Sequence, residues 1–245
     1  MKNIREFLKN ENMTFPDGEA LEAFKRQREE EDRAMVQRIL QENKEARKAK
    51  YQRVFNENSL ISPALLTATF ENYEPGTFEL REAKRITMDY AERFALDDPH
   101  NLLMMGDYGV GKSHLAVSIT KRLAEKGFTS IFVSTPELLT KIRSTYNRDS
   151  NHSELELLEL IKTVDCLVLD DIGAEYGTDW AVTKMFEVVD SRLGRHTIYT
   201  TNLGPEELAE RLGPRNMSRM KQDTEILVMQ GDDYRDTVLC RRERR

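Results

Sequence analysis

The chain has 245 residues, of which 33% are charged and 39% hydrophobic, and its formal net charge is −6. This length suits one α/β nucleotide-binding domain with a small additional region, and the negative charge argues against a protein that coats duplex DNA. Its two cysteines, Cys166 and Cys240, form no CxxC pair, which argues against a disulfide framework or a structural zinc site. No apolar run could span a membrane and the N-terminus lacks a secretion signal, so we expect a cytoplasmic protein.

The first 66 residues differ in composition from the rest. Residues 19–56 contain no Gly or Pro, and their many charges surround a thin apolar stripe that includes Met35 and Ile39. A helix cannot bury so narrow a stripe by itself, so the pattern predicts a long helix that docks on a partner helix. A solvated charged arm is the alternative. We therefore expect a helical partner-binding region over residues 1–66 and a second domain over residues 67–245.

Apolar runs alternate with helix-like stretches in the second domain. An amphipathic helix is expected over residues 78–94. Strands are expected at 101–105, 130–133, 166–169, 197–199 and 225–229. Strands that alternate with helices favour a parallel sheet covered on both faces. The predicted fold class is therefore α/β, with a three-layer αβα domain around a parallel central sheet and a small helical region before it.

The segment GDYGVGKS at residues 106–113 fits the phosphate-loop pattern GxxxxGK[ST]. It follows an apolar strand and opens a helix, which is the context that the motif requires. Backbone N–H groups of such a loop cradle phosphate oxygens, Lys112 reaches the β- and γ-phosphates, and the Ser113 hydroxyl binds Mg²⁺. The residues expected to contact ATP are Gly106, Asp107, Tyr108, Gly109, Val110, Gly111, Lys112, Ser113 and His114.

The run CLVLDD at residues 166–171 ends an apolar strand with two acids. Two carboxylates at such a place are costly to bury, and a metal ion beside them offsets the cost. Asp170 is expected to hold Mg²⁺, and Asp171 to orient or deprotonate the attacking water. Many related ATPases have Glu at the second position. The shorter Asp171 therefore predicts slow turnover.

Two arginines follow the last helix of the predicted sheet domain. Arg215 and Arg219 have no evident buried acidic partner in the sequence. An arginine that one subunit donates to the ATP of its neighbour would suit them, because it stabilises charge developing on the γ-phosphate.

Several segments, in this order, resemble the DnaC/DnaI family of AAA+ helicase loaders and the related IstB-like ATPases that assist transposases. They are Asn72-Tyr73, the phosphate loop, LVLDDIG at 167–173, TTN at 200–202, Arg215 with Arg219, and DDYR at 232–235. The resemblance implies an AAA+ P-loop ATPase with ATP and Mg²⁺ as cofactors. It also implies weak hydrolysis stimulated by DNA, and self-association with ATP at the subunit interface.

The same resemblance implies roles for single residues. Asn202 would touch the γ-phosphate and the attacking water, although a simple turn or cap is the alternative for this residue. Arg219 would act in the neighbouring subunit's site, with Arg215 as its substitute. Arg235 would reach the ATP of its own subunit, and Tyr73 would border the adenine.

A DNA-binding segment is expected between the second and third strands. On a helix Arg143 and Tyr146 share a face, with Lys141 toward its edge. A cation beside an aromatic ring suits single-stranded DNA, and the resemblance implies an extra helix here that grips it. The alternative is that Tyr146 packs against the protein while the cations are solvated.

These features favour an ATP-dependent loader that binds a replicative helicase through residues 1–66 and delivers it onto single-stranded DNA during replication initiation. An IstB-like ATPase that assists a transposase is the alternative, since it shares the ATPase core. A small-molecule kinase would leave Asn202 and Arg219 without a role. The zinc-binding N-terminal cysteines of the DnaI branch are absent, so the first region resembles the DnaC branch or a phage-type loader.

Overall fold

A computed structural model of the chain describes residues 22, 25–42, 45, 59, 61–146, 153–174 and 177–236. The chain divides into two units, Met1–Arg47 and Lys48–Arg245. Within the described ranges, no helix has the length and apolar character needed to cross a membrane.

Residues 25–42 of the first unit form a helix whose side chains are exposed. Its large apolar side chains are 46–63% exposed and follow one stripe, which consists of Met35, Val36, Ile39 and Leu40. The predicted helix is confirmed over this stretch, and the rest of the range 19–56 lies outside the described residues. The domain boundary at residue 66 stays a prediction; the side chains of Ile61 and Leu65 pack against the core of the second unit.

The second unit is built on a parallel sheet of five strands in the order β2-β3-β4-β1-β5. The strands are β1 (Asn101–Gly106), β2 (Ser130–Ser134), β3 (Cys166–Asp170), β4 (His196–Thr201) and β5 (Thr224–Met229). Each of the five strands expected from the sequence is confirmed.

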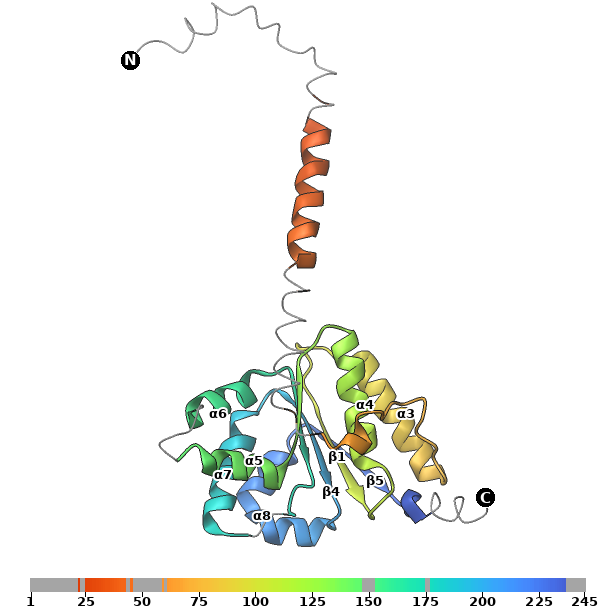
Figure 1. Cartoon of the computed structure of the whole chain (residues 1–245), viewed down its shortest axis with the longest axis vertical. Coiled ribbons are helices and arrows are strands. Elements are labelled where there is room, and N and C mark those ends of the chain that lie inside the picture. Colours follow the sequence, from red (N-terminus) through yellow and green to blue (C-terminus); the bar gives the residue numbers. More distant parts are fainter. Residues whose placement is uncertain are drawn as a thin grey trace, which may run out of the picture. The chain divides into compact units, whose positions relative to one another are not determined.

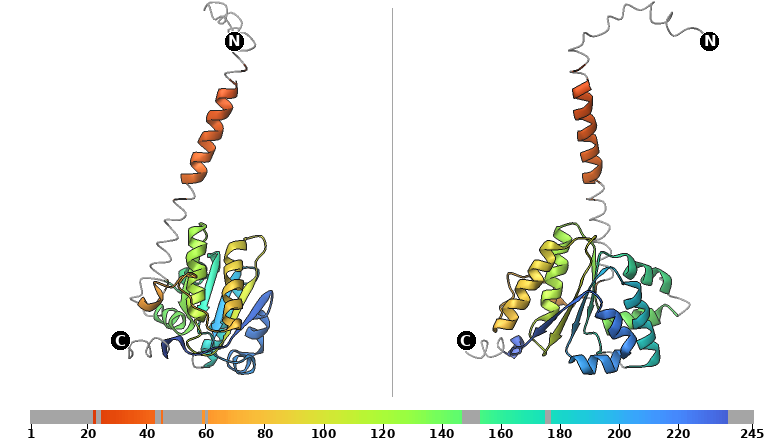
Figure 2. Two further views of the ribbon diagram at one scale, coloured as in Figure 1. Left: turned by 90° about the vertical axis from the view of Figure 1, so that its right-hand side faces the viewer. Right: turned by 180° about the vertical axis from the view of Figure 1, so that it is seen from behind.

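Helices cover both faces of this sheet, as Figures 1 and 2 show. They are the short 3₁₀ helix η1 (Pro63–Leu65) and the α-helices α3 (Phe78–Arg93), α4 (Lys112–Glu125), α5 (Thr135–Ser144), α6 (Glu154–Thr163), α7 (Asp179–Ser191) and α8 (Pro205–Met220). Helices α3 and α4 lie on one face and α5 to α8 on the other. The predicted three-layer αβα fold is therefore confirmed.

The central strands are apolar on both faces because each face has its own core. Along β1, Leu102 and Met104 belong to the core under α3 and α4, whereas Leu103 and Met105 belong to the core under α5 to α8. Successive side chains of a strand point to opposite faces, so an unbroken apolar run is what a doubly covered strand requires. The strand β1 lies inside the sheet, between β4 and β5.

The register of the strands brings their polar ends to one edge. Leu169 of β3 lies opposite Tyr199 of β4, so Asp170 and Thr200 follow at the same level. Met105 of β1 lies opposite Thr201, which puts the start of the phosphate loop beside the end of β4. The carboxyl ends of β1, β3 and β4 thus form one polar edge, where ligands of open α/β sheets bind.

A candidate nucleotide site and a candidate DNA-binding cluster

The phosphate loop connects β1 to α4 and is braced from behind by an aromatic ring. Gly111, the residue before α4, has φ = 91°, and a Cβ atom there would lie 2.4 Å from the Tyr73 ring. The buried Tyr73 donates its hydroxyl hydrogen to the carbonyl oxygen of Val110 at 2.7 Å. These contacts show Tyr73 supporting the loop, and its expected position beside the adenine stays a prediction.

The ammonium group of Lys112 is held at the mouth of this loop. Its Nζ donates hydrogen bonds to the carbonyl oxygens of Gly106 at 2.8 Å and Asp107 at 2.6 Å. Burial lowers the pKa of Lys112, and the nearby charges of Asp171 and Asp170 oppose this shift. Phosphate oxygens are stronger partners than carbonyls for a partly desolvated ammonium, so the geometry suits an incoming phosphate.

Two other side chains expected at the phosphates face elsewhere. The Nε2 atom of His114 lies 2.8 Å from the carbonyl oxygen of Thr69, and its ring packs on Tyr73 with centroids 5.4 Å apart. Burial lowers the pKa of His114. The Tyr108 side chain is 66% exposed. His114 therefore ties the segment before α3 to the phosphate loop, whereas the Tyr108 side chain faces solvent.

Asp170 ends β3 as a buried carboxylate. Its Oδ1 accepts a hydrogen bond from the Thr200 hydroxyl at 2.6 Å. Burial raises the pKa of Asp170 from 3.8 to about 6, and hydrogen bonds from Thr200 and Ser113 partly offset this rise. A cation beside Asp170 would favour its ionised form, and the Ser113 hydroxyl is a second oxygen ligand. These residues therefore fit Mg²⁺.

The rest of the coordination would come from outside the chain. Among the residues that the structure describes, no three His, Cys, Asp or Glu side chains are grouped as metal ligands. Mg²⁺ typically takes one or two protein ligands and completes its shell with phosphate oxygens and water. A site of Ser113 and Asp170 beside a phosphate loop has this composition.

Asp171 is positioned by β4 rather than by its own strand. Its φ of 53° lies in the left-handed region, which is uncommon outside glycine and marks a constrained residue. Its backbone N–H donates to the Thr200 hydroxyl at 2.9 Å, and its Oδ1 accepts from Asn202 Nδ2 at 3.0 Å. Asp171 and Asn202, expected at one site from separate motifs, are therefore in direct contact.

Thr200 is a site residue that sequence reasoning did not single out. Its fully buried hydroxyl bonds to the side chain of Asp170 and to the backbone of Asp171, so it fixes both acids at once. In the sequence, Thr200 is recognisable only as part of the segment TTN at residues 200–202. The alignment of β3 with β4 is the signal that would have identified it.

Arg219 has an acidic partner that the sequence did not reveal. Its Nε lies 3.0 Å from Oδ1 of Asp190 at the end of α7, and both side chains are about two-fifths exposed (44% and 41%). Packing of α7 on α8 forms this pair, so it could not be predicted from the spacing of residues in the sequence. Arg215 is exposed on the same helix, and among the described residues it has no ion-pair partner.

Arg235 also pairs within the chain. Its Nε and Nη2 donate to the two carboxylate oxygens of Asp233 at 3.0 and 2.9 Å. The intervening Tyr234 donates its backbone N–H to the carbonyl oxygen of Gly109 at 3.2 Å. The predicted contact of Arg235 with ATP is untested, but the turn that carries it lies against the phosphate loop.

The expected DNA-binding residues gather around a tryptophan. The Cζ atom of Arg143 lies 4.5 Å from the centroid of the Trp180 ring, and the Tyr146 ring meets that ring edge-on at 6.4 Å. The sequence predicted Tyr146 on a helix together with Arg143. Helix α5 ends at Ser144, so Tyr146 instead lies in the turn that follows the helix. Lys141 is half-buried on α5. Trp180, at the start of α7, was missed because it lies 37 positions after Arg143 in the sequence.

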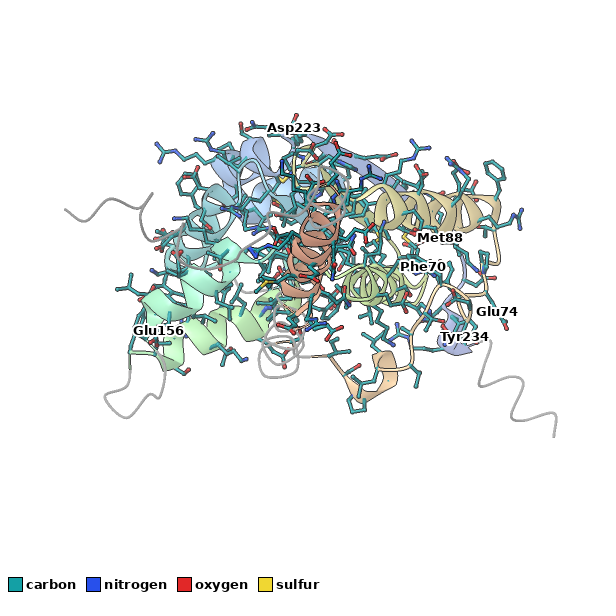
Figure 3. All side chains as sticks on the ribbon, turned by 90° about the horizontal axis from the view of Figure 1, so that it is seen from above. Phe70, Glu74, Met88, Glu156, Asp223 and Tyr234 are labelled. Carbon is teal, nitrogen blue, oxygen red and sulfur yellow. The ribbon has the colours of Figure 1, made fainter. Side chains whose placement is uncertain are left out.

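The cluster also includes an acid whose charge is balanced. The Tyr146 hydroxyl lies 3.4 Å from Glu154 Oε1, and Glu154 forms an ion pair with Lys184. Figure 3 shows Glu156, at the start of the same helix α6, on the opposite side of the unit from Tyr234. The aromatic cluster and the turn beside the phosphate loop are therefore separate regions.

A parallel αβα sandwich with this strand order, a phosphate loop after β1 and paired acids after β3 defines the AAA+ class of P-loop ATPases. The chain belongs to the IstB-like ATP-binding protein family, whose model matches residues 16–239. It is 30% identical over 227 residues to the replicative helicase loader DnaC of Escherichia coli (strain K12), covering 91% of this chain and 89% of that relative. The resemblance inferred from the motifs is confirmed.

Solved structures give the same classification. The chain is similar to the crystal structure of the DnaC helicase loader, with a TM-score of 0.64 and 26% identity over 69% of this chain and 100% of that one. It is also similar to AMPPCP-bound DnaA from Aquifex aeolicus, with a TM-score of 0.61 and 18% identity over 76% of this chain and 56% of that one. The likeness to DnaA concerns the fold alone.

Proposed function

We propose that this protein is an ATP-dependent loader, which binds a replicative helicase in the cytoplasm and delivers it onto single-stranded DNA during replication initiation. The match to DnaC carries the proposal, because it covers 91% of the chain. A match of that extent includes most of residues 1–66 in addition to the ATPase domain. The IstB-like family model also begins in the first region, at residue 16, so the likeness to a named helicase loader, rather than the extent of the match alone, favours this function over the transposase alternative.

ATP turnover in this proposal rests on four side chains. Lys112 binds the β- and γ-phosphates, and Asp170 with Ser113 holds Mg²⁺, which neutralises charge on the phosphate oxygens when bound. Asp171 orients the attacking water and accepts its proton. Its carboxylate is fixed by the amide of Asn202 at 3.0 Å, so it keeps one position relative to the phosphate loop. Because Asp is shorter than Glu, we expect weak hydrolysis. The likeness to helicase loaders further implies that DNA stimulates it.

Self-association would complete the site through Arg219, with Arg215 as its substitute. Asp190 holds the guanidinium of Arg219 at the surface of α8, at 3.0 Å, where a neighbouring subunit can reach it. An exposed pair of this kind is worth less than about 1 kcal/mol, so a triphosphate can replace the carboxylate.

Mixing two inactive variants tests this shared site. Arg219→Ala keeps its own phosphate loop, and Lys112→Ala keeps its arginine. We expect hydrolysis to return when the two are mixed. If the variants co-assemble and no ratio restores phosphate release, Arg219 does not act in a neighbour's site.

Single-stranded DNA would bind at the cluster of Arg143, Tyr146 and Trp180, with Lys141 at its edge. The guanidinium stacked on Trp180 can take a phosphate, and the exposed Tyr146 ring can stack on a base. Trp180 is the only tryptophan in the chain, so its fluorescence reports on this cluster alone. Oligothymidine should quench it.

Three variants make the DNA measurement specific. Tyr146→Ala should weaken affinity by roughly ten-fold, since stacking is typically worth about 1–3 kcal/mol per base. Arg143→Ala should also reduce the dependence of affinity on salt. Arg93→Ala, which removes an exposed arginine from α3 in the other helical layer, is the matched control and should bind normally. Unchanged affinity in the first two variants would mean that the strand is held elsewhere.

The loader function itself is tested by capturing partners with the full-length chain. The wild-type protein should recover a hexameric helicase from lysate and promote its unwinding of DNA coated with single-strand-binding protein. Met35→Glu with Ile39→Glu should abolish capture, because both side chains belong to the exposed apolar stripe. Gln37→Glu with Gln41→Glu adds the same charge to the same helix and should not. Recovery of a transposase instead would support the alternative function.

A further inference from the structure

The turn after β5 lies directly on the phosphate loop. Besides the hydrogen bond from Tyr234 N–H to the carbonyl oxygen of Gly109 (3.2 Å), the Asp233 side chain contacts Gly109 itself. Gly109 has φ = +76°, and a Cβ atom added there would lie 1.9 Å from Oδ1 of Asp233. The loop that is built to bind anionic phosphates therefore has a carboxylate packed against it.

This carboxylate is held by Arg235 through three hydrogen bonds. The guanidinium donates two, at 3.0 and 2.9 Å, and the Arg235 backbone N–H donates a third to Oδ1 at 2.9 Å. Hydrogen bonds from Arg235 lower the pKa of Asp233, so this acid stays ionised.

The beginning of the turn is held by contacts with α3 and the residue before that helix, whereas the Arg235 side chain near its end is exposed. Thr77 donates its hydroxyl hydrogen to the carbonyl oxygen of Gln230 at 2.9 Å, and Gly231 packs against Leu80 of α3. The Arg235 side chain is 68% exposed. The start of the turn is therefore held in place, while the segment that carries Arg235 can shift when the guanidinium changes partner.

We propose that Asp233 determines how the site distinguishes ATP from ADP, because its carboxylate holds Arg235 until a γ-phosphate takes over the guanidinium. This inference rests on the proposed nucleotide site. Phosphate and carboxylate offer the same two-oxygen geometry to a guanidinium, and the more highly charged phosphate is the stronger partner. ADP lacks the group that competes, so it leaves the pair of Asp233 and Arg235 intact.

The test compares two neighbouring carboxylates in the full-length chain. Asp233→Asn should tighten binding of Mg²⁺ with AMPPCP about three- to five-fold, since the phosphate no longer displaces an exposed ion pair. Binding of ADP should change by less than this. Asp232→Asn is the matched control, because it removes the same charge one residue earlier. Within the part of the chain that the structure describes, Asp232 is exposed and its carboxylate has no partner.

Two further measurements separate the exchange from a general charge effect. In an Arg235→Ala background, Asp233→Asn should give no gain in AMPPCP affinity. Hydrogen exchange of wild-type residues 232–236 should respond to AMPPCP and not to ADP.

Equal effects of Asp233→Asn and Asp232→Asn, weaker binding of both nucleotides, or an equal exchange response to both would overturn the proposal. Failure of the wild-type chain to bind either nucleotide would overturn the nucleotide site itself, and this inference with it.

Discussion

Replacing Asp170 by Asn should stabilise the nucleotide-free protein at neutral pH. The folded state raises the pKa of Asp170 from 3.8 to about 6, chiefly by burial. A raised pKa means that the folded state favours the protonated acid. Its stabilising contribution is complete below pH 3.8 and is lost as the pH rises through 6. At about 1.4 kcal/mol per pKa unit, ionised Asp170 costs the folded state about 3 kcal/mol.

The amide of Asn stays neutral and keeps an oxygen that can accept the Thr200 hydroxyl. We therefore expect Asp170→Asn to exceed the wild type by up to about 3 kcal/mol in free energy of unfolding at pH 7.5. The difference should approach zero near pH 4. Urea unfolding of both proteins at a series of pH values measures it, and comparing the two proteins removes the contribution of other titrating groups.

Nucleotide should reverse the order of stability. Mg²⁺ with AMPPCP should stabilise the wild type, whose ionised carboxylate can hold the cation, far more than Asp170→Asn. A difference between the two proteins that does not change with pH would refute the argument. So would a wild type that is the more stable protein at pH 7.5 without nucleotide.

Substitutions at three other positions test the remaining parts of the site. Lys112→Ala should abolish nucleotide binding in calorimetry without unfolding the chain, because the ammonium contacts loop carbonyls and not the apolar core; near-normal affinity in a folded variant would contradict the phosphate loop. Asp171→Asn should preserve AMPPCP affinity and reduce phosphate release by about 10²-fold or more, so normal turnover would mean that another group handles the water. Thr200→Val should weaken Mg²⁺-dependent binding about ten-fold, by loss of a hydrogen bond to a charged group, whereas Thr200→Ser should not; equal losses in both would point to packing.

The fold was predictable because its strongest signals are local. Each strand is a short apolar run, and each run lies between helix-like segments, which is the pattern that favours a doubly covered parallel sheet. The phosphate loop and the acids of β3 were predictable for the same reason. Their function requires fixed residues at fixed spacing, next to a strand end that the sequence also marks.

The partners of these residues were not predictable, because they depend on which elements pack together. Thr200 reaches Asp170 through the β3–β4 register, Asp190 reaches Arg219 through the packing of α7 on α8, and Trp180 reaches Arg143 from the start of α7. No spacing within the sequence specifies any of these contacts. Tyr146 shows the converse error, since a helical spacing placed it on α5 although the helix ends two residues earlier.

The cations expected near the γ-phosphate share one electrostatic property. Three cations expected near the γ-phosphate are held by their own chain: Lys112 by loop carbonyls, Arg219 by Asp190 and Arg235 by Asp233. Because the two arginine pairs are partly exposed, each is weak enough to be exchanged for a phosphate. The affinity for nucleotide is then a difference between two sets of contacts, and substituting the aspartates changes it without any contact to the ligand.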